Sequence, residues 1–558
     1  MRSHVLNFVK PAFMEFRSLN FLNGAYTTMV DCKKLRTPVE ISERKFQDAC
    51  SKLHSLRSAM AVREKATKHA YHEVTETKKQ FLCLGMTMEK LDQLSVVHIA
   101  GTKGKGSTCA YTESILRNCG YKTGMFCSPH LVDLRERIQI NGRHLSESTF
   151  SRYFFEVYDR LLESMKNGAI SDMPHYFQFL TLMALYVFLK EPVDVAILEV
   201  GIGGQYDCTN FINTAVVCGI SLLDYDHEHI LGSTLDEIAW QKAGIFKHRV
   251  PAITQPQHQK AMNVLIERAQ AKNNPLYTVS GNVPGLNKDA TNYEPFQLLN
   301  ISLAIQLARV WLRDHDQENS RKQWFSDCNI QLGSTNLPVL DCDFPDFSKF
   351  TRGIKTCHIP GRLQIIKHES VSFYLDGAHT EESMKACADW FLKQCNLEMK
   401  SKSSTKMIRV LMFTVTGGRK VKNLLSILKE CSFDVVIFLP NLQHNPKVIE
   451  DLKELATLEN MEHCRDMQTV WYNLHQEISE CQYKSTRRNT MEAVSILCPS
   501  VNDALYWCSS DVKNLVKPSY KLIGVPALLR GAAHIQLLAT GSLLLVGKLL
   551  SFLNTDGL

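Results

Sequence analysis

The sequence lacks the features of several protein classes. No two of its 18 cysteines form a C-x-x-C pair, so it supports neither a zinc ribbon nor a thioredoxin-type site, nor a small secreted disulfide scaffold. It also has no long unbroken apolar run, because Gln536, Thr540, Ser542 and Lys548 interrupt the most apolar stretch, 535–553. These two absences predict free thiols in a reducing compartment, a soluble intracellular protein and no stable membrane insertion.

The sequence also lacks a large excess of charged residues of one sign. The 64 Lys and Arg residues exceed the 57 Asp and Glu residues by only 7 in 558 positions. This mild excess suits small anionic ligands and does not require nucleic acid, so no nucleic-acid partner is expected. Hydrophobic residues make up 44% and charged residues 22%, which excludes a fully disordered, collagen-like or coiled-coil chain. At roughly 100–200 residues per domain, the length predicts two or three domains.

The N-terminal segment is short of acidic residues. Residues 1–28 contain Arg2, His4, Lys10 and Arg17 but only one acid. This composition is typical of a weak mitochondrial transit peptide, and a flexible basic extension is the alternative, so residues 1–41 are assigned to one or the other. Initiation at Met29 would remove most of the segment. The expected location is therefore the cytoplasm, the mitochondrion or both.

Apolar runs alternate with helical patterns through the first half of the chain. The runs at 95–100, 193–200 and 215–220 have few polar interruptions, as in strands that are buried on both faces. The pattern predicts an α/β fold with a parallel central sheet over residues 42–312.

The alternation stops and then resumes in the second half. Residues 313–350 are polar without a clear period and are predicted to be a linker. Strand-like and helix-like segments alternate again over 351–558, which predicts a smaller, doubly wound α/β domain. Within it, 458–490 is polar and is expected to be an irregular surface insertion.

A glycine-rich loop follows the first predicted strand directly. It reads Gly101-Thr-Lys-Gly-Lys-Gly-Ser107, and residues 108–119 after it are predicted to be helical. In a strand–loop–helix context the backbone N–H groups of such a loop can surround phosphate oxygens at a helix N-terminus. Lys105 can reach the β- and γ-phosphates of a nucleotide, and a hydroxyl at the end of the loop can face Mg²⁺. A tight β–α turn would explain the glycines but not the two lysines.

Candidate metal ligands follow other predicted strands. Ser128 comes after the strand candidate at 122–126, Glu199 lies near the end of its apolar run, and His227 and His229 follow the third run. In a parallel sheet the carboxyl ends of neighbouring strands share one edge, so these residues are expected to converge on one crevice. Mg²⁺ needs few protein ligands there, because water and phosphates complete its coordination. A structural salt bridge is the alternative for Glu199, and ordinary capping or surface positions are the alternative for the histidines.

Lys242 lies at the end of an otherwise apolar helical pattern. Its simplest interpretation is a side chain whose charged end reaches solvent. A functional lysine near the metal crevice is the sharper hypothesis, which the pattern alone does not favour.

Many ordered motifs together resemble the Mur ligase-like family of ATP-dependent amide-forming enzymes, and within it the folylpolyglutamate synthases of eukaryotic type. The resemblance covers about residue 42 to the C-terminus. The matching motifs are His98-Ile-Ala-Gly-Thr-Lys-Gly-Lys-Gly-Ser107, Ser128-Pro-His-Leu131, Arg135-Glu-Arg137, Leu198-Glu-Val-Gly-Ile-Gly-Gly204, Asp207-Cys-Thr-Asn210, Asp226-His227, Lys242-Ala-Gly-Ile245, Pro360-Gly-Arg362 with Gln364, Asp376-Gly-Ala-His379 and Thr540-Gly-Ser-Leu543.

The resemblance implies an ATP-binding P-loop domain followed by a smaller glutamate-ligase domain, with the active site between them. It implies ATP-dependent addition of L-glutamate in γ-linkage to tetrahydrofolate and its polyglutamates through an acyl phosphate. The products are retained in cells for one-carbon metabolism. It further implies a monomer that uses Mg²⁺ and, as an additional expectation, a monovalent cation such as K⁺.

The resemblance also assigns roles to individual residues. The nucleotide contacts are Gly104, Lys105, Gly106, Ser107, Asn300, Arg362 and Asp376. The magnesium ligands are Ser128, Glu199 and His227. The catalytic residues are Lys105, His379 near the transferred phosphate, and Lys242, which is carbamylated in many relatives.

Three positions depart from the family pattern. Leu544 stands where many relatives have His, Gln178 where an acid is common, and His358 where Trp is frequent. None belongs to the phosphate loop or the proposed magnesium ligands, so the departures concern substrate details. Two alternatives stay open: a dihydrofolate synthase that adds the first glutamate to dihydropteroate, and a nucleotide-binding regulatory protein that has lost catalysis.

Overall fold

The structure is a computed structural model of the whole chain. The residues that it describes are 45–63, 70–284, 286, 293–315, 331–332, 337–343, 347–368, 370–401, 407–415, 420–440, 458–482, 494–508, 527–530 and 532–553. The predicted transit peptide or extension at 1–41 lies outside them. No helix within them combines the length and the apolar composition needed to cross a membrane.

The first half of the chain forms a sheet of ten strands in the order β4-β3-β2-β5-β1-β6-β7-β8-β10-β9. The run from β2 to β10 is parallel, and β3, β4 and β9 pair antiparallel at the two edges. The strands are β1 (Val96–Ala100), β2 (Thr123–Phe126), β3 (Ile138–Ile140), β4 (Arg143–His144), β5 (Val195–Glu199), β6 (Val217–Ile220), β7 (Ala252–Thr254), β8 (Leu276–Val279), β9 (Gln331–Leu332) and β10 (Pro338–Leu340).

Helices cover both faces of this sheet, which confirms the predicted α/β architecture. Successive side chains of a strand point to opposite faces, so Val96 and Val97 belong to different hydrophobic clusters. One face carries α3 (Phe46–Arg63), α4 (Ala70–Cys83), α7 (Glu147–Lys166), α8 (Tyr176–Lys190), α10 (Leu235–Lys242) and α11 (Gln259–Ala271). The other face carries α6 (Lys105–Asn118), α12 (Pro295–His315) and α13 (Phe347–Thr356).

The second half forms a six-stranded sheet in the order β11-β12-β16-β13-β14-β15, parallel except for β11. Its strands are β11 (Gln364–Lys367), β12 (Val371–Leu375), β13 (Met407–Phe413), β14 (Val435–Phe438), β15 (Val494–Leu497) and β16 (His534–Thr540). One face packs on α14 (Glu381–Ser401), α15 (Val421–Lys429) and α16 (Leu458–Gln482). The other face packs on α17 (Val501–Cys508), α18 (Ala527–Arg530) and α19 (Leu543–Leu553).

Two segments differ from the sequence expectation. The described part of 313–350 is not an irregular linker, because it contains the end of α12, strands β9 and β10 and the start of α13. Strands as short as β9 and β10 contain too few residues to show a regular hydrophobic period. The polar composition of the segment therefore made them hard to recognise in the sequence. The exact division between the domains remains a prediction.

The prediction of an irregular surface insertion at 458–490 was wrong for the described residues of that segment, 458–482. These residues form the long helix α16, which buries Cys464, Met467, Trp471 and Leu474 against the second sheet. This spacing follows the helical period, but the residues between these positions, such as Arg465, Asp466 and Gln468, are mostly polar, and the polar composition of the whole segment masked it.

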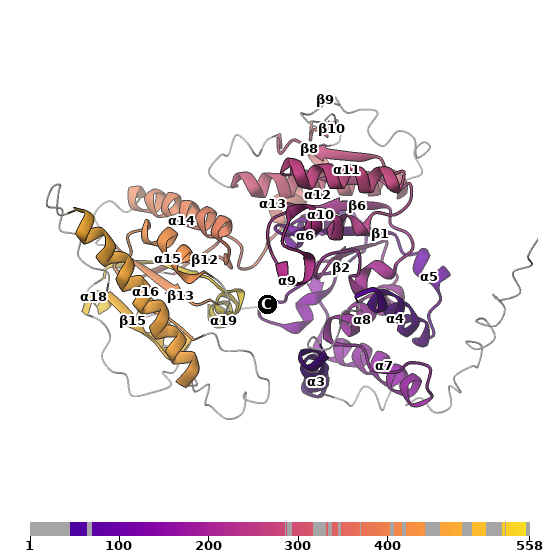
Figure 1. Cartoon of the computed structure of the whole chain (residues 1–558), viewed down its shortest axis with the longest axis horizontal. Helices are drawn as coiled ribbons and strands as arrows, with labels where there is room; N and C mark the ends of the chain where they lie inside the picture. The colour runs from indigo at the N-terminus through magenta and orange to yellow at the C-terminus, as the bar shows by residue number, and fades with distance from the viewer. Residues whose placement is uncertain are drawn as a thin grey trace, which may run out of the picture.

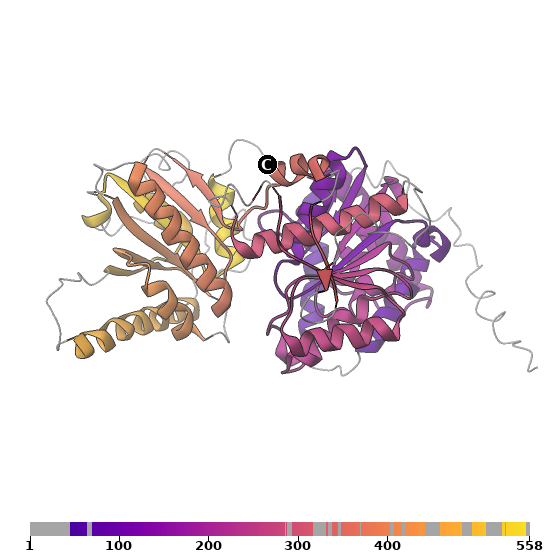
Figure 2. The same ribbon diagram turned by 90° about the horizontal axis from the view of Figure 1, so that it is seen from above.

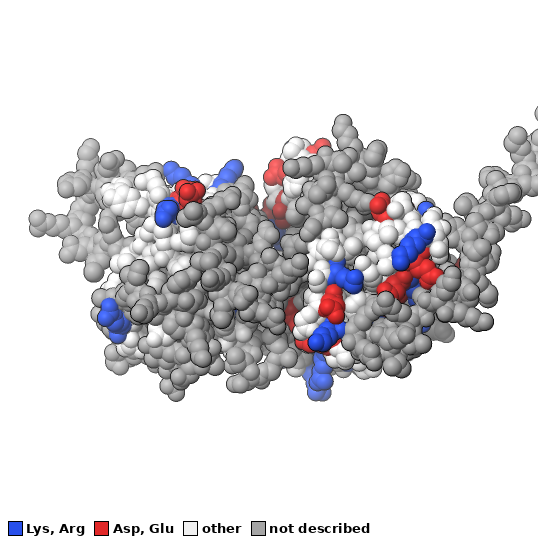
Figure 3. Space-filling view, turned by 90° about the horizontal axis from the view of Figure 1, so that it is seen from below, with Lys and Arg blue, Asp and Glu red and all other residues white. Residues whose placement is uncertain are grey.

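The two halves form two lobes that meet along one side (Figures 1 and 2). The loop after β2 joins them, because Leu131 packs in the same hydrophobic cluster as Val546 and Leu549 of α19. An ion pair of 2.9 Å between Lys393 Nζ of α14 and Glu294 Oε1 adds a second connection. On the face in Figure 3, described Lys and Arg side chains stand beside Asp and Glu, in line with the small net charge.

Candidate functional site between the two lobes

The phosphate loop is anchored to the loop that follows the neighbouring strand β6. The backbone N–H groups of Thr102 and Lys103 both donate to the carbonyl of Leu222, at 2.9 and 3.0 Å. The Thr102 hydroxyl donates to the carbonyl of Asp224 at 3.0 Å. β1 lies in the centre of the sheet, so the loop opens at the carboxyl ends of β1, β5 and β6, where ligands of parallel sheets collect.

Helix α6 starts at Lys105, and the loop turns into it at Gly104. The residue has φ +85°, a left-handed conformation that a glycine adopts without strain. A Cβ at this position would lie 2.2 Å from Asn300 Oδ1. Asn300 is held in place by Gln255, whose Nε2 donates to the same oxygen at 2.7 Å. The turn therefore requires glycine, and Asn300 forms one wall of the loop.

Glu199 at the end of β5 faces the same loop. Its Oε2 accepts a hydrogen bond from the backbone N–H of Ser128 at 2.8 Å and would lie 3.5 Å from a Cβ at Gly106. The carboxyl is buried, and burial raises its pKa, whereas Lys105 opposes the rise. Because burial outweighs the neighbouring cations, a further cation brought to this edge of the loop would stabilise the carboxylate.

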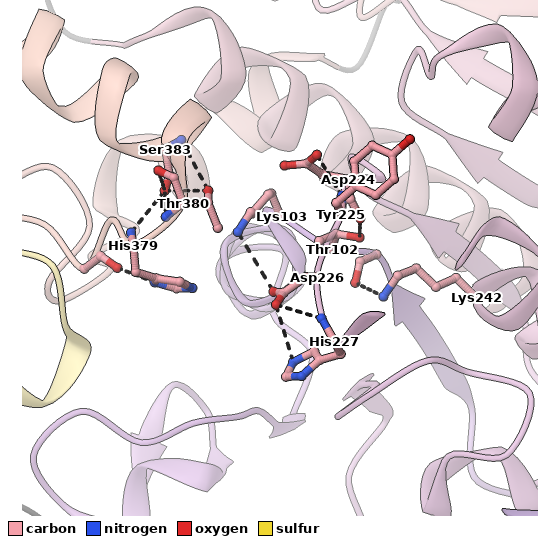
Figure 4. Close-up of polar contacts among 12 residues, drawn as sticks. Thr102, Lys103, Asp224, Tyr225, Asp226, His227, Lys242, His379, Thr380 and Ser383 are labelled. Carbon is pink, nitrogen blue, oxygen red and sulfur yellow. Dashed lines mark hydrogen bonds and ion pairs between the residues drawn. The ribbon is translucent and has the colours of Figure 1, made fainter. Parts of the chain in front are cut away.

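Asp226 and His227 lie on the β6 side of the loop (Figure 4). Lys103 Nζ is 4.0 Å from Asp226 Oδ2, and His227 Nε2 is 4.0 Å from Asp226 Oδ1. His227 is half exposed and has φ +53° at the start of α9 (Glu228–Leu231). Burial lowers the pKa of its imidazole, and Lys105 and Lys242 lower it further, although Asp226 opposes them. A neutral imidazole can act as a metal ligand.

The donor set around the loop suits Mg²⁺ but not a metal held by many protein ligands. In the described part of the chain, no three or more His, Cys, Asp or Glu side chains lie close enough together to hold a metal ion. A hydroxyl, a buried carboxylate and an imidazole beside a phosphate loop are nevertheless adequate for Mg²⁺ when phosphates and water supply its other ligands.

Lys242 ends α10 and does not extend into solvent. Its Nζ is buried and donates to the carbonyl of Gly101, the first residue of the phosphate loop, at 2.8 Å (Figure 4). Burial lowers the pKa of Lys242 to about 7, and Lys105 contributes to the same direction. The amine is thus partly neutral at physiological pH and touches the loop.

The second lobe brings Arg362, Asp376 and His379 toward the loop. Asp376 follows β12, and its two carboxylate oxygens accept from the backbone N–H groups of Leu363 and Ala378, both at 2.9 Å. These bonds hold the segments before β11 and after β12 together. Burial raises the pKa of Asp376, whereas the charge of Arg362 lowers it. Arg362 also acts on the pKa of Glu199 in the first lobe.

His379 lies where α14 begins. Its Nδ1 lies 2.8 Å from the carbonyl of Gly377, and its backbone N–H donates to the hydroxyl of Ser383. The imidazole of His379 lowers the pKa of Asp226, so the two lobes influence each other electrostatically at this point. Figure 4 shows His379 and Thr380 on the opposite side of Lys103 from Lys242.

The predicted residues therefore form two groups. Direct contacts join Glu199 to the Ser128 backbone, Asn300 to the Gly104 turn and Lys242 to Gly101. Electrostatic effects link His227 to Lys105 and Arg362 to Lys103 of the loop, and His379 acts on Asp226 beside it. Lys105 and Ser107 lie in the first turn of α6, which starts three residues earlier than the predicted helix at 108–119.

Sequence reasoning missed the role of Asp207. Its Oδ2 accepts from the backbone N–H groups of Gly201 and Ile202, at 3.0 and 3.1 Å, and so holds the turn that follows Glu199. Its Oδ1 accepts from Thr209, which in turn contacts His98 Nε2 of β1 at 2.9 Å. The Asp-x-Thr spacing is a signal for such a local turn, but it does not reveal the contact to the β5 loop.

The departures from the family pattern occupy different environments. Gln178 is buried and donates to Thr77 Oγ1 at 2.9 Å, so it joins α8 to α4. His358 lies 3.4 Å from Gln364 Nε2 beside β11. Leu544 lies in the first turn of α19, where its backbone N–H donates to the Ser542 hydroxyl at 3.2 Å.

Comparison with known proteins identifies relatives along nearly the whole chain. The chain is 38% identical over 91% of its length to the mitochondrial folylpolyglutamate synthase of Homo sapiens and covers 92% of that protein. It is 34% identical over 92% of its length to a folylpolyglutamate synthase of Arabidopsis thaliana, of which it covers 90%. No protein-family model matches the chain.

Solved structures share the fold at lower identity. The folylpolyglutamate synthase of Mycobacterium tuberculosis complexed with ADP and AMPPCP has a TM-score of 0.60 at 20% identity, over 87% of this chain and 96% of that one. The apo form of the L. casei enzyme has a TM-score of 0.60 at 18% identity, over 91% and 99%. With the sequence matches to the curated relatives, these findings show that the chain belongs to the folylpolyglutamate synthase family.

Proposed function

We propose that this protein adds L-glutamate in γ-linkage to tetrahydrofolates at the expense of ATP. The terminal carboxylate of the folate attacks the γ-phosphorus of ATP, which gives an acyl phosphate and ADP. The amine of glutamate then attacks the acyl carbon, phosphate leaves, and the amine loses a proton as the amide forms. The observation that carries the proposal is the buried Glu199 carboxylate beside a complete phosphate loop, opposite Arg362 of the second lobe.

The residues of the first lobe hold the nucleotide. The N–H groups of Gly104, Gly106 and Ser107 surround the phosphates, and Lys105 offsets the charge that gathers on the transferred group. Asn300 borders the same loop. Arg362 and Asp376 come from the second lobe, so closure of the lobes completes the nucleotide site and excludes water. His379 is proposed to lie near the transferred phosphate and the incoming glutamate.

Mg²⁺ is the metal that these residues suit. We infer that Ser128, Glu199 and His227 would hold it, and that it would supply positive charge to offset the charge of the ATP phosphates. Glu199 would gain from a cation, because burial destabilises its charge in the free protein. A K⁺ requirement is a separate proposal that rests on the resemblance alone.

Lys242 has the chemistry for carbamylation. An amine with a pKa of about 7 is partly unprotonated at neutral pH, and only that form adds carbon dioxide. We propose that the product, a carboxylate-like group, lies beside Gly101 near a second cation. Intact-protein mass measurement with and without bicarbonate tests this: a bicarbonate-dependent mass gain that disappears in Lys242→Arg is expected.

We propose a mitochondrial form made from Met1, because mammalian relatives are described as mitochondrial. A cytoplasmic form made from Met29 is a separate proposal that rests on the sequence alone. A monomer is the proposed assembly state.

The decisive experiment measures incorporation of labelled L-glutamate with Mg-ATP and either tetrahydrofolate or dihydropteroate as acceptor. Growth of glutamate chains on tetrahydrofolate is the expected result, and Lys105→Ala should abolish it without lowering the melting temperature. Incorporation only on dihydropteroate would make the protein a dihydrofolate synthase. Nucleotide binding without incorporation on either acceptor would make it a regulatory protein.

A further inference from the structure

The phosphate loop contains a second lysine, Lys103, whose ammonium makes no hydrogen bond to the described part of the chain. Lys103 Nζ is buried, and no described residue lies within hydrogen-bonding distance of it. Its closest acidic partner is Asp226, at 4.0 Å, which is longer than a hydrogen bond. An ammonium has three donors, and leaving all of them unfilled in a buried place is unfavourable unless a ligand fills them.

The surroundings of this ammonium come from both lobes. Figure 4 shows Lys103 extending from the loop into the space between Asp226 and the His379–Thr380 turn at the start of α14. Burial lowers the pKa of Lys103, Asp226 and Asp224 oppose this, and Lys105 and Arg362 lower it further. The charges of Lys105 and Arg362 are thus close enough to the Lys103 ammonium to lower its pKa.

This convergence of cations favours an anion between the lobes. Lys103, Lys105 and Arg362 repel one another, Asp226 and Asp224 offset part of that repulsion, and an anion among the three cations would offset more of it. The loop carries Lys105 at the position expected for the β- and γ-phosphates, and Lys103 lies two residues earlier, on the side of the loop that faces the second lobe. Lys103 therefore extends into the space between the two lobes.

We propose that Lys103 is a second anion-binding lysine, which holds the anionic oxygen group that the reaction brings between the lobes. This inference rests on the proposed function. The group is the γ-phosphoryl of ATP as it becomes the acyl phosphate, and a carboxylate of the incoming glutamate offers the same chemistry. If the anion is the phosphoryl group, Lys103 keeps its contact with that group after the bond to ADP has broken, whereas Lys105 keeps its contact with ADP.

The test compares nucleotides with and without a γ-phosphoryl group. Lys103→Gln should weaken binding of AMPPCP about tenfold or more, because a charge-assisted hydrogen bond is lost, and should change ADP binding by less than about twofold. Lys103→Arg should restore part of the AMPPCP affinity. Lys260→Gln, on the exposed surface of α11, is the matched control and should change neither affinity.

The outcomes separate the two anions and the alternative of a purely structural lysine. Unchanged affinity for both nucleotides with a raised KM for glutamate would place the ammonium on a glutamate carboxylate. Equal loss of ADP and AMPPCP affinity with a lower melting temperature would mean that the loop has collapsed, and the proposal would be wrong. Unchanged affinities and kinetic constants would also overturn it. Failure of the proposed function is distinct, because the unmodified protein would then incorporate no glutamate.

Discussion

At the residue scale, single atoms decide whether the phosphate loop can form. Gly104 combines a left-handed φ of +85° with a neighbouring side chain, Asn300, that fills the space where a Cβ would stand. Gly120, at the other end of α6, has a similar φ of +100°, but a Cβ there would meet nothing within 4 Å. A comparison of substitutions at the two glycines therefore separates the cost of backbone strain from the cost of steric overlap with a neighbour.

We expect Gly104→Ala to reduce ADP affinity at least about tenfold, equivalent to about 1.4 kcal/mol, because Asn300 and the loop backbone must move apart. Gly120→Ala should cost only the conformational strain of about 1–2 kcal/mol in unfolding free energy and leave ADP affinity intact. Isothermal titration and urea unfolding measure the two quantities. Equal ADP affinities for both variants would contradict the steric argument.

Another residue-scale feature lies inside the second lobe. Glu398 of α14 accepts hydrogen bonds from Ser372 at 2.6 Å, Tyr374 at 2.9 Å and Gln536 at 3.0 Å, and His534 Nε2 lies 3.2 Å away. Burial alone would raise the pKa of this carboxyl, but the hydrogen bonds outweigh burial and lower the pKa to about 2. The charged form thus joins α14 to two strands of the sheet.

The sign of the pH dependence follows from this shift. The pKa in the folded protein is below the ordinary value of 4.5, so the stabilisation is complete above pH 4.5 and is lost as the pH falls toward 2. Glu398→Gln should lower the unfolding free energy at pH 7 by about 1–3 kcal/mol, with a smaller difference near pH 3. Urea unfolding at several pH values measures this. A pH-independent difference, or an equal effect of the exposed Glu430→Gln, would refute the assignment.

At the scale of elements, α6 connects the phosphate loop to α13, against which it packs in the first lobe. α13 crosses α6 so closely that a Cβ at Gly353 would lie 2.6 Å from Ile115 Cα and 2.8 Å from the carbonyl oxygen of Ser114. The Ser114 hydroxyl also donates to the Gly353 carbonyl at 2.8 Å. The two atoms that a Cβ at Gly353 would meet belong to the backbone of α6, which cannot rearrange as a side chain does.

Gly353→Ala should therefore push the two helices apart. Alanine normally stabilises a helix relative to glycine, so a loss of about 1–3 kcal/mol in unfolding free energy would isolate the effect of the close approach. Ser348→Ala, at an exposed position of the same helix, is the control. Denaturant unfolding gives the comparison, and a stabilised Gly353→Ala variant would show that α13 can shift freely.

At the scale of the whole molecule, the two lobes must meet at a fixed distance. The loop after β2 lies against α19, where a Cβ at Gly547 would lie 2.0 Å from the carbonyl oxygen of Leu131. The same β2 loop supplies Ser128, which binds Glu199 through its backbone. Contact between the lobes and the geometry of the proposed magnesium site therefore depend on one segment.

Gly547→Ala should displace the second lobe while each lobe stays folded. Because misplacement of reacting groups by about 1 Å can cost about 100-fold in rate, we expect turnover to fall about 10- to 100-fold. ADP affinity should change by less than about twofold, since most of the phosphate site lies in the first lobe. Ser551→Ala, exposed on the same helix, is the control. Normal turnover in Gly547→Ala would show that lobe contact does not limit catalysis.

The sequence by itself determined the phosphate loop, the α/β class of both halves and the nearness of Glu199 to the loop. These features are local or follow from a general rule: glycines and lysines between a strand and a helix form one contiguous segment, and parallel strands place their carboxyl ends together. The buried runs around β1, β5 and β6 were recognisable because strands covered on both faces are continuously apolar.

Only the tertiary structure decided the contacts between segments distant in the chain. It placed Lys242 on Gly101 and Leu131 against α19. It also turned a polar stretch into the helix α16, whose apolar side is visible only once the second sheet covers it. The physical reason is the same in each case. Hydrogen-bond geometry, burial and the resulting pKa shifts depend on neighbouring residues that come from other elements, some of them more than a hundred positions away in the sequence. The order of residues does not directly encode how close such elements lie in the folded protein.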